Sequence, residues 1–330
     1  MGPLEIILIV VGSLLLLLLL LCFVGGFYVH KMMFGHRFKL DPLQGVYTKE
    51  ILGLDAKPVE FYAKKNKLRG FLYSKQGYKE NVIVVYCHGM WACHNSYLQN
   101  IGYLADKGYQ VLGFDYIGTE SSEGKNLGGF GTSLKSLDYA IKFIKNDEEL
   151  KNKDIYVVGH SWGGFATSNI AALHPDIKGV VPMSPVIGVS ELTKGLLPKW
   201  MGFMAYLFKF IDSLKCGKYS YFNAIKSLNN YKGKVLFIHS IDDEMVKIDY
   251  STNLVKEKCK NKKIEYYIVE GKRHQPHYTL DACEKMYAFN SKIKGLSKEE
   301  VDNIKRETDF LAMGVIDPTV MDKVVELIEK

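Results

Sequence analysis

The hydrophobic pattern divides the chain into an apolar N-terminal segment and a longer body. From Ile6 to His30 there is no Asp, Glu, Lys or Arg, and the centre of this run, Leu14 to Leu21, is eight leucines in a row. A helix of about 20 apolar residues spans the hydrocarbon core of a bilayer, so the run is long enough to cross a membrane once. Residues 1–30 are predicted to be a transmembrane anchor, followed by a polar linker over residues 31–44.

The residues that flank the apolar run favour an uncleaved anchor with its body in the cytoplasm. A cleaved signal peptide begins with a basic region, whereas the only charge before this run is Glu5. Lys31, Arg37 and Lys39 follow the run, and positive charges mark the cytoplasmic side of a single-pass protein. The six cysteines contain no CxxC pair, which fits reduced thiols in that compartment.

In the body, residues 45–330, short β-type runs alternate with helical patterns. Runs at 58–63 and 68–73 are predicted to form an antiparallel pair, and the continuous apolar run at 82–86 is typical of a strand buried on both faces. Further strands are predicted at 110–114, 155–158, 179–182, 235–238 and 264–269, with helices at 97–106, 133–146, 165–173, 249–259 and 319–329. This order predicts an α/β fold whose central sheet is mostly parallel and is covered by helices on both faces.

A candidate nucleophile follows the strand predicted at 155–158. The sequence at 159–164 is GHSWGG, a G-x-S-x-G pattern that precedes a helical run. A serine on such a strand-to-helix turn has an exposed hydroxyl, and the flanking glycines allow the turn without Cβ clashes. Ser161 is therefore the predicted nucleophile.

A serine hydroxyl needs a base that takes its proton, and the base needs a carboxylate that fixes its tautomer. Asp243 follows the strand at 235–238, and His274 follows the strand at 264–269, so both come after Ser161 in the order expected for this type of site. Asp242 could replace Asp243, and His277 could replace His274. The predicted catalytic residues are Ser161, Asp243 and His274, with these two alternatives open.

The oxyanion of an acyl-transfer reaction needs two preorganised donors. The backbone N–H of Trp162, directly after the nucleophile, is one candidate. The other is the N–H of Met90, in the loop after the strand at 82–86, where Gly89 gives the backbone freedom.

On these motifs the chain resembles the α/β-hydrolases, specifically the group of S33 serine aminopeptidases, lysophospholipases and monoacylglycerol lipases. The resemblance rests on the following segments: His88-Gly89, Asp115 to Gly118, GHSWGG, the Asp243 loop and Gly271 to His274. Relatives usually carry glycine where this chain has Glu120 and Ser240. The resemblance implies a serine esterase mechanism that needs no cofactor.

Two segments of the body are predicted additions to this fold. A helical lid is expected at about 186–230, because the stretch from Leu196 to Leu214 is strongly apolar. Its side chains suit an acyl chain, and the predicted substrate-binding residues are Trp200, Met201, Phe203, Met204 and Phe208. A second helical insertion is expected at about 279–316, where Ser297 and Glu300 form a capping box; no chemistry is assigned to it.

Charge and metal-ligand spacing narrow the function further. The net charge of +7 is too mild and too scattered to indicate nucleic acid. The tight group of Cys87, His88, Cys93 and His94 fits no zinc spacing, so no metal is expected.

The sequence predicts a membrane-anchored serine hydrolase of lipid-like carboxylic esters, of the monoacylglycerol or lysophospholipid type. One alternative is an S33-type aminopeptidase, which would need an acidic pocket for the substrate amine; Glu120, Glu123 or Glu191 could supply it. The other is a non-catalytic protein that binds hydrophobic ligands or acts as a scaffold.

Overall fold

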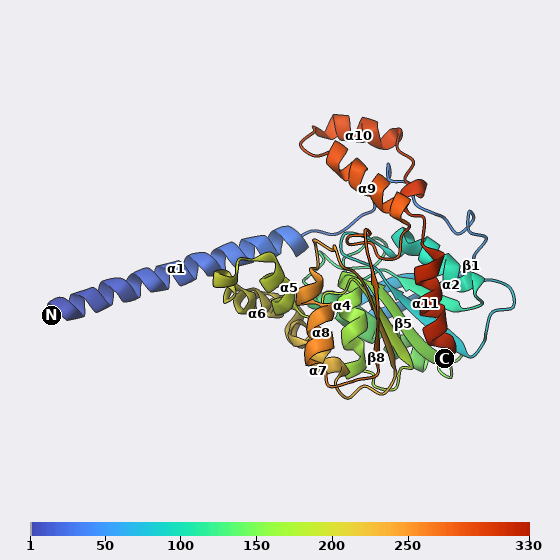
Figure 1. Cartoon of the computed structure of the whole chain (residues 1–330), viewed down its shortest axis with the longest axis horizontal. Coiled ribbons are helices and arrows are strands. Elements are labelled where there is room, and N and C mark those ends of the chain that lie inside the picture. The colour runs from blue at the N-terminus through green and yellow to red at the C-terminus, as the bar shows by residue number, and fades with distance from the viewer. Residues whose placement is uncertain (1) are drawn as a thin grey trace.

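An eight-stranded sheet forms the centre of the body in the computed structural model, which describes residues 2–330 (Figure 1). The strand order is β1-β2-β4-β3-β5-β6-β7-β8; β2 is antiparallel to both of its neighbours, and the other neighbouring strands are parallel. The strands are β1 (Asp55–Ala63), β2 (Asn66–Ser74), β3 (Val82–Cys87), β4 (Gln110–Phe114), β5 (Asp154–His160), β6 (Gly179–Met183), β7 (Lys234–Ser240) and β8 (Ile264–Val269). The predicted antiparallel pair and parallel sheet are confirmed.

Helices cover both faces of the sheet. Two helices pack on one face: α2 (Leu98–Asp106) and α11 (Pro318–Glu329). Four helices pack on the other face: α3 (Gly131–Asn146), α4 (Trp162–Asn169), α7 (Ala224–Leu228) and α8 (Thr252–Lys258). Alternate side chains of each central strand enter the two hydrophobic clusters of the core, which is why these strands are mostly apolar.

The N-terminal helix α1 (Pro3–Phe34) is longer than the predicted anchor and includes the first four residues of the predicted linker. It is long and apolar enough to cross a membrane. None of its residues from Pro3 to Gly25 is buried, whereas Gly26, His30 and Phe34, one turn apart, are buried against the body. The helix continues to Phe34 because that side chain packs against the rings of Phe130 and Trp162.

The two predicted additions are helical. Between β6 and β7 lie α5 (Val189–Leu196), α6 (Met204–Cys216) and α7, and α6 runs beside the end of α1 (Figure 1). Between β8 and α11 lie α9 (Leu280–Lys292) and α10 (Lys298–Arg306), which stand above the sheet as a hairpin. The capping box predicted at the start of α10 is present, because Ser297 Oγ accepts from the Glu300 N–H and the Glu300 carboxylate accepts from the Ser297 N–H.

Candidate active site

Ser161 lies on the turn that joins β5 to α4. Its φ is 57°, in the left-handed region that non-glycine residues rarely adopt. A Cβ on Gly159 would lie 2.3 Å from Thr167 Oγ1, and a Cβ on Gly163 would lie 2.1 Å from the Cys87 carbonyl oxygen. Both positions exclude any side chain, so the spacing of the two glycines around the serine follows from the packing of this turn.

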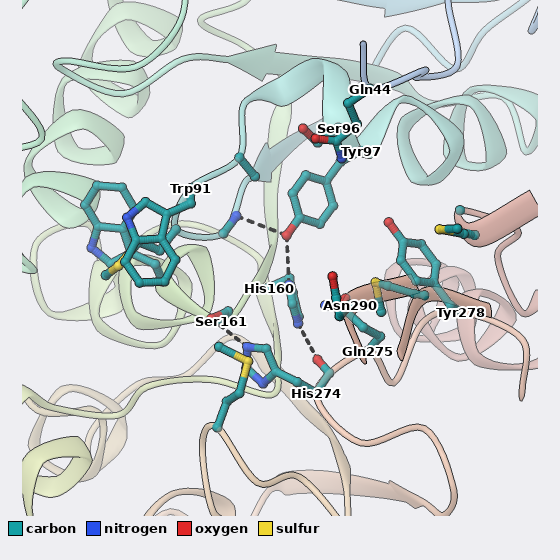
Figure 2. A pocket seen from close by; sticks show the side chains of 18 of the residues that line it. Gln44, Trp91, Ser96, Tyr97, His160, Ser161, His274, Gln275, Tyr278 and Asn290 are labelled. Carbon is teal, nitrogen blue, oxygen red and sulfur yellow. Dashed lines mark hydrogen bonds between the residues drawn. The ribbon is translucent and has the colours of Figure 1, made fainter. Parts of the chain in front are cut away.

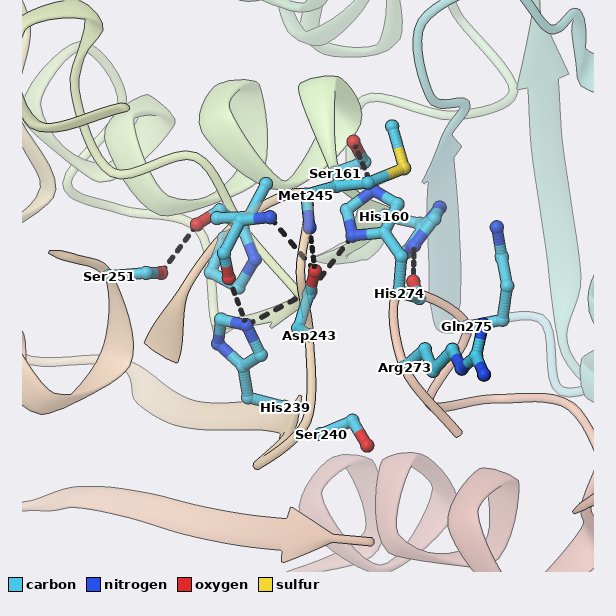
Figure 3. Close-up of polar contacts among 12 residues, drawn as sticks. His160, Ser161, His239, Ser240, Asp243, Met245, Ser251, Arg273, His274 and Gln275 are labelled. Carbon is cyan, nitrogen blue, oxygen red and sulfur yellow. Dashed lines mark hydrogen bonds and ion pairs between the residues drawn. The ribbon is translucent and has the colours of Figure 1, made fainter. Parts of the chain in front are cut away.

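Ser161, His274 and Asp243 form a hydrogen-bonded chain at the C-terminal edge of the sheet (Figure 3). His274 Nε2 lies 2.9 Å from Ser161 Oγ, and His274 Nδ1 lies 2.8 Å from Asp243 Oδ2. The carboxylate can only accept, so Nδ1 carries the proton and Nε2 is left to accept from the serine hydroxyl. This is the geometry that activates a serine for attack on a carbonyl carbon.

The surroundings of Asp243 keep its carboxyl ionised. Its other oxygen, Oδ1, accepts from the N–H groups of Met245 and Val246 at 3.0 and 2.8 Å. Burial by itself would raise the pKa of Asp243, but hydrogen bonds from His239 and His274 hold that pKa below its usual range. Asp243 therefore keeps its negative charge beside the His274 imidazole.

The two alternatives for the acid and the base lie elsewhere. The Asp242 carboxylate accepts from the N–H groups of Gly271 and Arg273 at 3.1 and 3.2 Å, and so fixes the loop that carries His274. The His277 ring is fully buried against His160, and within residues 2–330 neither of its nitrogens has a hydrogen-bond partner. The structure therefore brings Asp243 and His274 to Ser161, and neither Asp242 nor His277.

The two predicted oxyanion donors lie in the same cavity as Ser161. Met90 and Trp162 both line it. Trp162 is the first residue of α4, and the first N–H groups of a helix have no partner within the helix. The assignment of both N–H groups to an oxyanion remains a prediction.

Comparison with known proteins agrees with this fold. The family model described as serine aminopeptidase, S33, matches residues 78–218. An esterase from Pyrococcus furiosus has a similar structure, with 20% identity, a TM-score of 0.59 and coverage of 89% of this chain and 97% of that chain. Est1E from Butyrivibrio proteoclasticus, solved with ferulic acid bound, gives 19% identity, a TM-score of 0.55 and coverage of 82% and 100%. No curated protein matches the sequence.

The chain has the α/β-hydrolase fold. The predicted fold and the predicted resemblance to the S33 group are confirmed, and the enzyme is a serine hydrolase. The central strands and the edge at which Ser161 lies are those of this fold.

In this hydrolase a second hydrogen-bonded chain joins the loop before Met90 to the loop of His274 (Figure 2). The Gly89 N–H donates to Tyr97 Oη at 3.2 Å, and the Tyr97 hydroxyl donates to His160 Nδ1 at 2.8 Å. His160 Nε2 donates to the His274 carbonyl at 2.7 Å. The direction of each bond is fixed because a carbonyl only accepts. Sequence reasoning missed this role of Tyr97 and His160.

We expect Tyr97→Phe to lower kcat by about 10- to 100-fold, because small misplacements of reacting groups have effects of that size. The change leaves the Gly89 N–H and His160 Nδ1 buried without a partner, and it loosens the loop that carries Met90. Steady-state kinetics on a soluble p-nitrophenyl ester measure the effect. Tyr103→Phe removes a hydroxyl that bonds to Asp322 far from the site and serves as the control. Equal kcat in the two variants would contradict a positioning role for Tyr97.

Three buried histidines near the site are held neutral. Burial lowers the pKa of His88 to about 4, and burial together with the neighbouring His274 lowers the pKa of His160 to about 3. Burial, with the charges of His160 and His274, also lowers the pKa of His277 well below its usual value. Each of these groups therefore binds a proton in the unfolded chain at a pH where the folded chain does not.

The free energy of unfolding is expected to fall as the pH drops below about 6.5, with an uptake of about three protons on unfolding near pH 5. When the pKa of a histidine is lower in the folded chain than in the unfolded chain, the free energy of unfolding is unaffected above the unfolded pKa. It decreases as the pH falls from the unfolded pKa toward the folded pKa. Three such groups give a slope of about 4 kcal/mol per pH unit. Denaturant unfolding between pH 8 and pH 5 measures this slope. His277→Phe should reduce it by about one proton and the exposed His36→Gln should not; equal slopes in both would contradict the assignment.

The cavity at Ser161 has a volume of about 800 Å³. Its walls include the end of α1 with the linker, the loop of Met90, helix α5, the loop after β7, and the hairpin of α9 and α10. The apolar side chains that line it include Met33, Val186, Leu192, Leu196, Met286, Phe289, Ile293, Phe310 and Met313. Apart from histidines, the only charged residues that line it in the described part of the chain are Glu244 and Lys305.

The five residues predicted to bind substrate do not line this cavity. They are Trp200, Met201, Phe203, Met204 and Phe208. Trp200 and Phe203 are exposed to solvent, and the Phe208 ring packs 5.6 Å from the ring of His30. The prediction placed the apolar side chains of the lid over the site, whereas the structure turns α6 toward α1 and gives the lid's share of the cavity wall to α5.

Helix α9 supplies a wall that sequence reasoning missed. Met286 and Phe289 on α9 and Ile293 at its C-cap lie at spacings of three and four and line the cavity. On the same helix the Tyr287 hydroxyl accepts from the His274 N–H at 3.2 Å. The spacing of these residues indicates an apolar side of the helix, but the charged residues around them are typical of an ordinary solvent-exposed helix.

The cysteine and histidine group after β3 has structural contacts. His94 Nδ1 lies 2.8 Å from Asp115 Oδ1, and the His88 ring stacks on Tyr116 with ring centres 3.9 Å apart. Within residues 2–330, no group of three or more His, Cys, Asp or Glu side chains is arranged to hold a metal ion.

Proposed function

We propose that this serine hydrolase is a membrane-anchored esterase that cleaves lipid-like carboxylic esters, of the monoacylglycerol or lysophospholipid type. The observation that carries the proposal is the apolar cavity that opens on Ser161 and is partly walled by Met33, at the end of the membrane-spanning candidate α1. An acyl chain gains about 0.8 kcal/mol for each methylene that it buries, so a wall of Met, Leu, Ile and Phe side chains favours long acyl groups.

In the proposed mechanism Ser161 Oγ attacks the ester carbonyl while His274 Nε2 takes its proton. The negative charge of Asp243 stabilises the imidazolium that forms. The N–H groups of Met90 and Trp162 stabilise the oxyanion. The alcohol leaves with the proton from His274, and water, deprotonated by the same histidine, releases the acid from Ser161.

The positions of the three carboxylates that an aminopeptidase could use to bind a substrate amine support an ester substrate over an amide substrate. Glu120 accepts from the Leu40 N–H at 2.7 Å, Glu123 accepts from the Lys67 N–H at 2.9 Å, and Glu191 accepts from Ser190 Oγ at 3.0 Å. None of the three lines the cavity, where Glu244 is the only carboxylate among the residues described.

Membrane insertion through residues 6–30 and a cytoplasmic body complete the proposal. The basic residues Lys31, Arg37 and Lys39 follow the apolar run and support this orientation. Proteolysis of the body in sealed inside-out vesicles tests it: a cytoplasmic body is digested there, and a protected body would place it on the other side.

Hydrolysis of a p-nitrophenyl ester series from acetyl to palmitoyl, by the full chain in detergent, tests the proposed activity. We expect kcat/KM to rise with acyl length up to the capacity of the cavity. Hydrolysis of aminoacyl amides without ester turnover would favour the aminopeptidase. Neither activity, with no labelling of Ser161 by a fluorophosphonate, would favour a binding or scaffold protein.

A further inference from the structure

The lid carries a row of exposed aromatic and aliphatic side chains that faces away from the cavity. Trp200 is 77% exposed, and Phe203, Tyr206, Phe210 and Leu214 are each about half exposed or more. From Phe203 onward their spacing of three and four places them on one side of α6. We call this set the α6 face; a contiguous apolar surface of this kind marks an interaction site.

Cations border the α6 face, and acids are missing from it. Lysines 194, 199, 209, 215 and 218 lie along residues 192–218, and the only acid in this described range is the fully buried Asp212. Lys194 and Lys209 each place their ammonium over the ring of Tyr206, at 4.7 and 5.6 Å from its centre. Lysines that lie along aromatic rings with their charges outward are typical of a segment at the level of lipid headgroups.

The α6 face is held at a fixed position on α1. His30 Nε2 lies 2.9 Å from Asp212 Oδ1, and both side chains are buried. Asp212 Oδ1 also accepts from the Phe130 N–H at 2.7 Å, and its Oδ2 accepts from Ser220 Oγ at 2.5 Å, so this one carboxylate joins α1, α6 and the start of α3. One turn before His30, the side chain of Ile211 fills the space beside Gly26.

The length of α1 sets the depth of this contact. The part of α1 that the body leaves uncovered, Pro3–Gly25, is about 34 Å long at about 1.5 Å per residue, close to the roughly 30 Å of a hydrocarbon core. The first residue of α1 that the body buries is Gly26, so the part of the proposed span 6–30 that can lie in the hydrocarbon core ends at Gly25. Because α6 packs on α1 from this point, α6 lies at the level where the helix leaves the bilayer.

We propose that the α6 face is a second membrane contact, which inserts its aromatic side chains into the interfacial region of the leaflet that α1 leaves and pairs its lysines with anionic lipid headgroups. The inference rests on the proposed insertion of α1 and not on the proposed ester chemistry. It places the lid, and the cavity wall that α5 contributes, directly on the membrane surface.

Fluorescence quenching of Trp200 in the full chain, reconstituted in phosphatidylcholine vesicles with and without phosphatidylserine, tests the proposal. The signal of Trp200 is the difference between the natural chain and Trp200→Phe. We expect lipids brominated near the headgroup end of the acyl chain to remove at least about half of it, more so with phosphatidylserine, while aqueous acrylamide has little effect. The matched control is Asn152→Trp in the Trp200→Phe background. Asn152 is exposed and lies in the turn before β5, at the opposite end of that strand from Ser161, so acrylamide and not the brominated lipid should quench it.

The other outcomes overturn the proposal, and they are distinguishable. Quenching of Trp200 by acrylamide alone would show that the face is in water. Protection from both quenchers would show that another protein, such as a second copy of the chain, covers it. Release of the chain from the vesicles by alkaline carbonate would show that α1 is not inserted, which removes the basis of the inference and leaves the ester chemistry untouched.

Discussion

Ser161→Ala is expected to lower kcat on a medium-chain p-nitrophenyl ester by about 10⁵-fold or more, because the acyl-enzyme can no longer form. Its hydroxyl is the group within hydrogen-bond distance of His274 Nε2 at the cavity. Progress curves at saturating substrate, with the enzyme concentration checked by absorbance, measure the loss.

Ser96→Ala is the control for this change. Ser96 lines the same cavity, but its hydroxyl contacts Cys93, and we expect its kcat to stay within about tenfold of the natural enzyme. Unchanged turnover in Ser161→Ala, with turnover lost in Ser96→Ala, would move the nucleophile to the loop after β3.

Asp243→Asn is expected to lower kcat by about 10⁴-fold near neutral pH. The amide retains the shape of the carboxylate but can present its NH₂ group to His274 Nδ1, which then loses its proton and leaves Nε2 unable to accept from Ser161. It also removes the negative charge that stabilises the imidazolium. The ratio of kcat for the two enzymes, with unfolding curves to confirm the fold, gives the result.

The adjacent Asp242→Asn provides a matched comparison. The Gly271 and Arg273 N–H groups bond to different oxygens of Asp242, so the asparagine oxygen keeps one of these bonds and loses the other. The bond between Asp243 and His274 Nδ1 is not altered, so we expect a loss of no more than about tenfold. A larger loss in Asp242→Asn than in Asp243→Asn would identify Asp242 as the acid.

Local signals made the sheet and the strand-to-helix turn predictable from the sequence. Strands β4 and β8 match their predicted bounds. β4 is buried at every position, whereas β8 lies at the edge of the sheet and is buried only at Ile264, but both consist mostly of apolar and aromatic residues, which favour strands. The position of Ser161 followed from a short motif whose two glycines are required by contacts within the turn itself.

Predictions that depended on which way a helix faces were less successful. The apolar side chains from Trp200 to Phe208 are compatible both with a wall around an acyl chain and with an outer surface. The local sequence does not reveal that His30, more than 180 residues away, bonds to Asp212 and turns α6 toward α1. Similarly, the apolar side of α9 gains its role only because the hairpin folds back over the cavity. In both cases long-range packing assigns the face.

The choice between Asp242 and Asp243 also required the structure. Both carboxylates follow β7, but successive residues in a tight turn point in different directions, and a shift of one residue exchanges their partners. The choice between His274 and His277 depended in the same way on the course of the loop after β8.

Mass-spectrometric mapping of the residue that reacts with a fluorophosphonate bearing a long alkyl chain is the most direct test of the central claim, that Ser161 is the nucleophile of this hydrolase. We predict one adduct per folded chain, on the peptide that contains Ser161, formed more slowly when excess ester is present and absent in Ser161→Ala. An adduct on another residue, or none on a folded chain that still hydrolyses esters, would contradict the account.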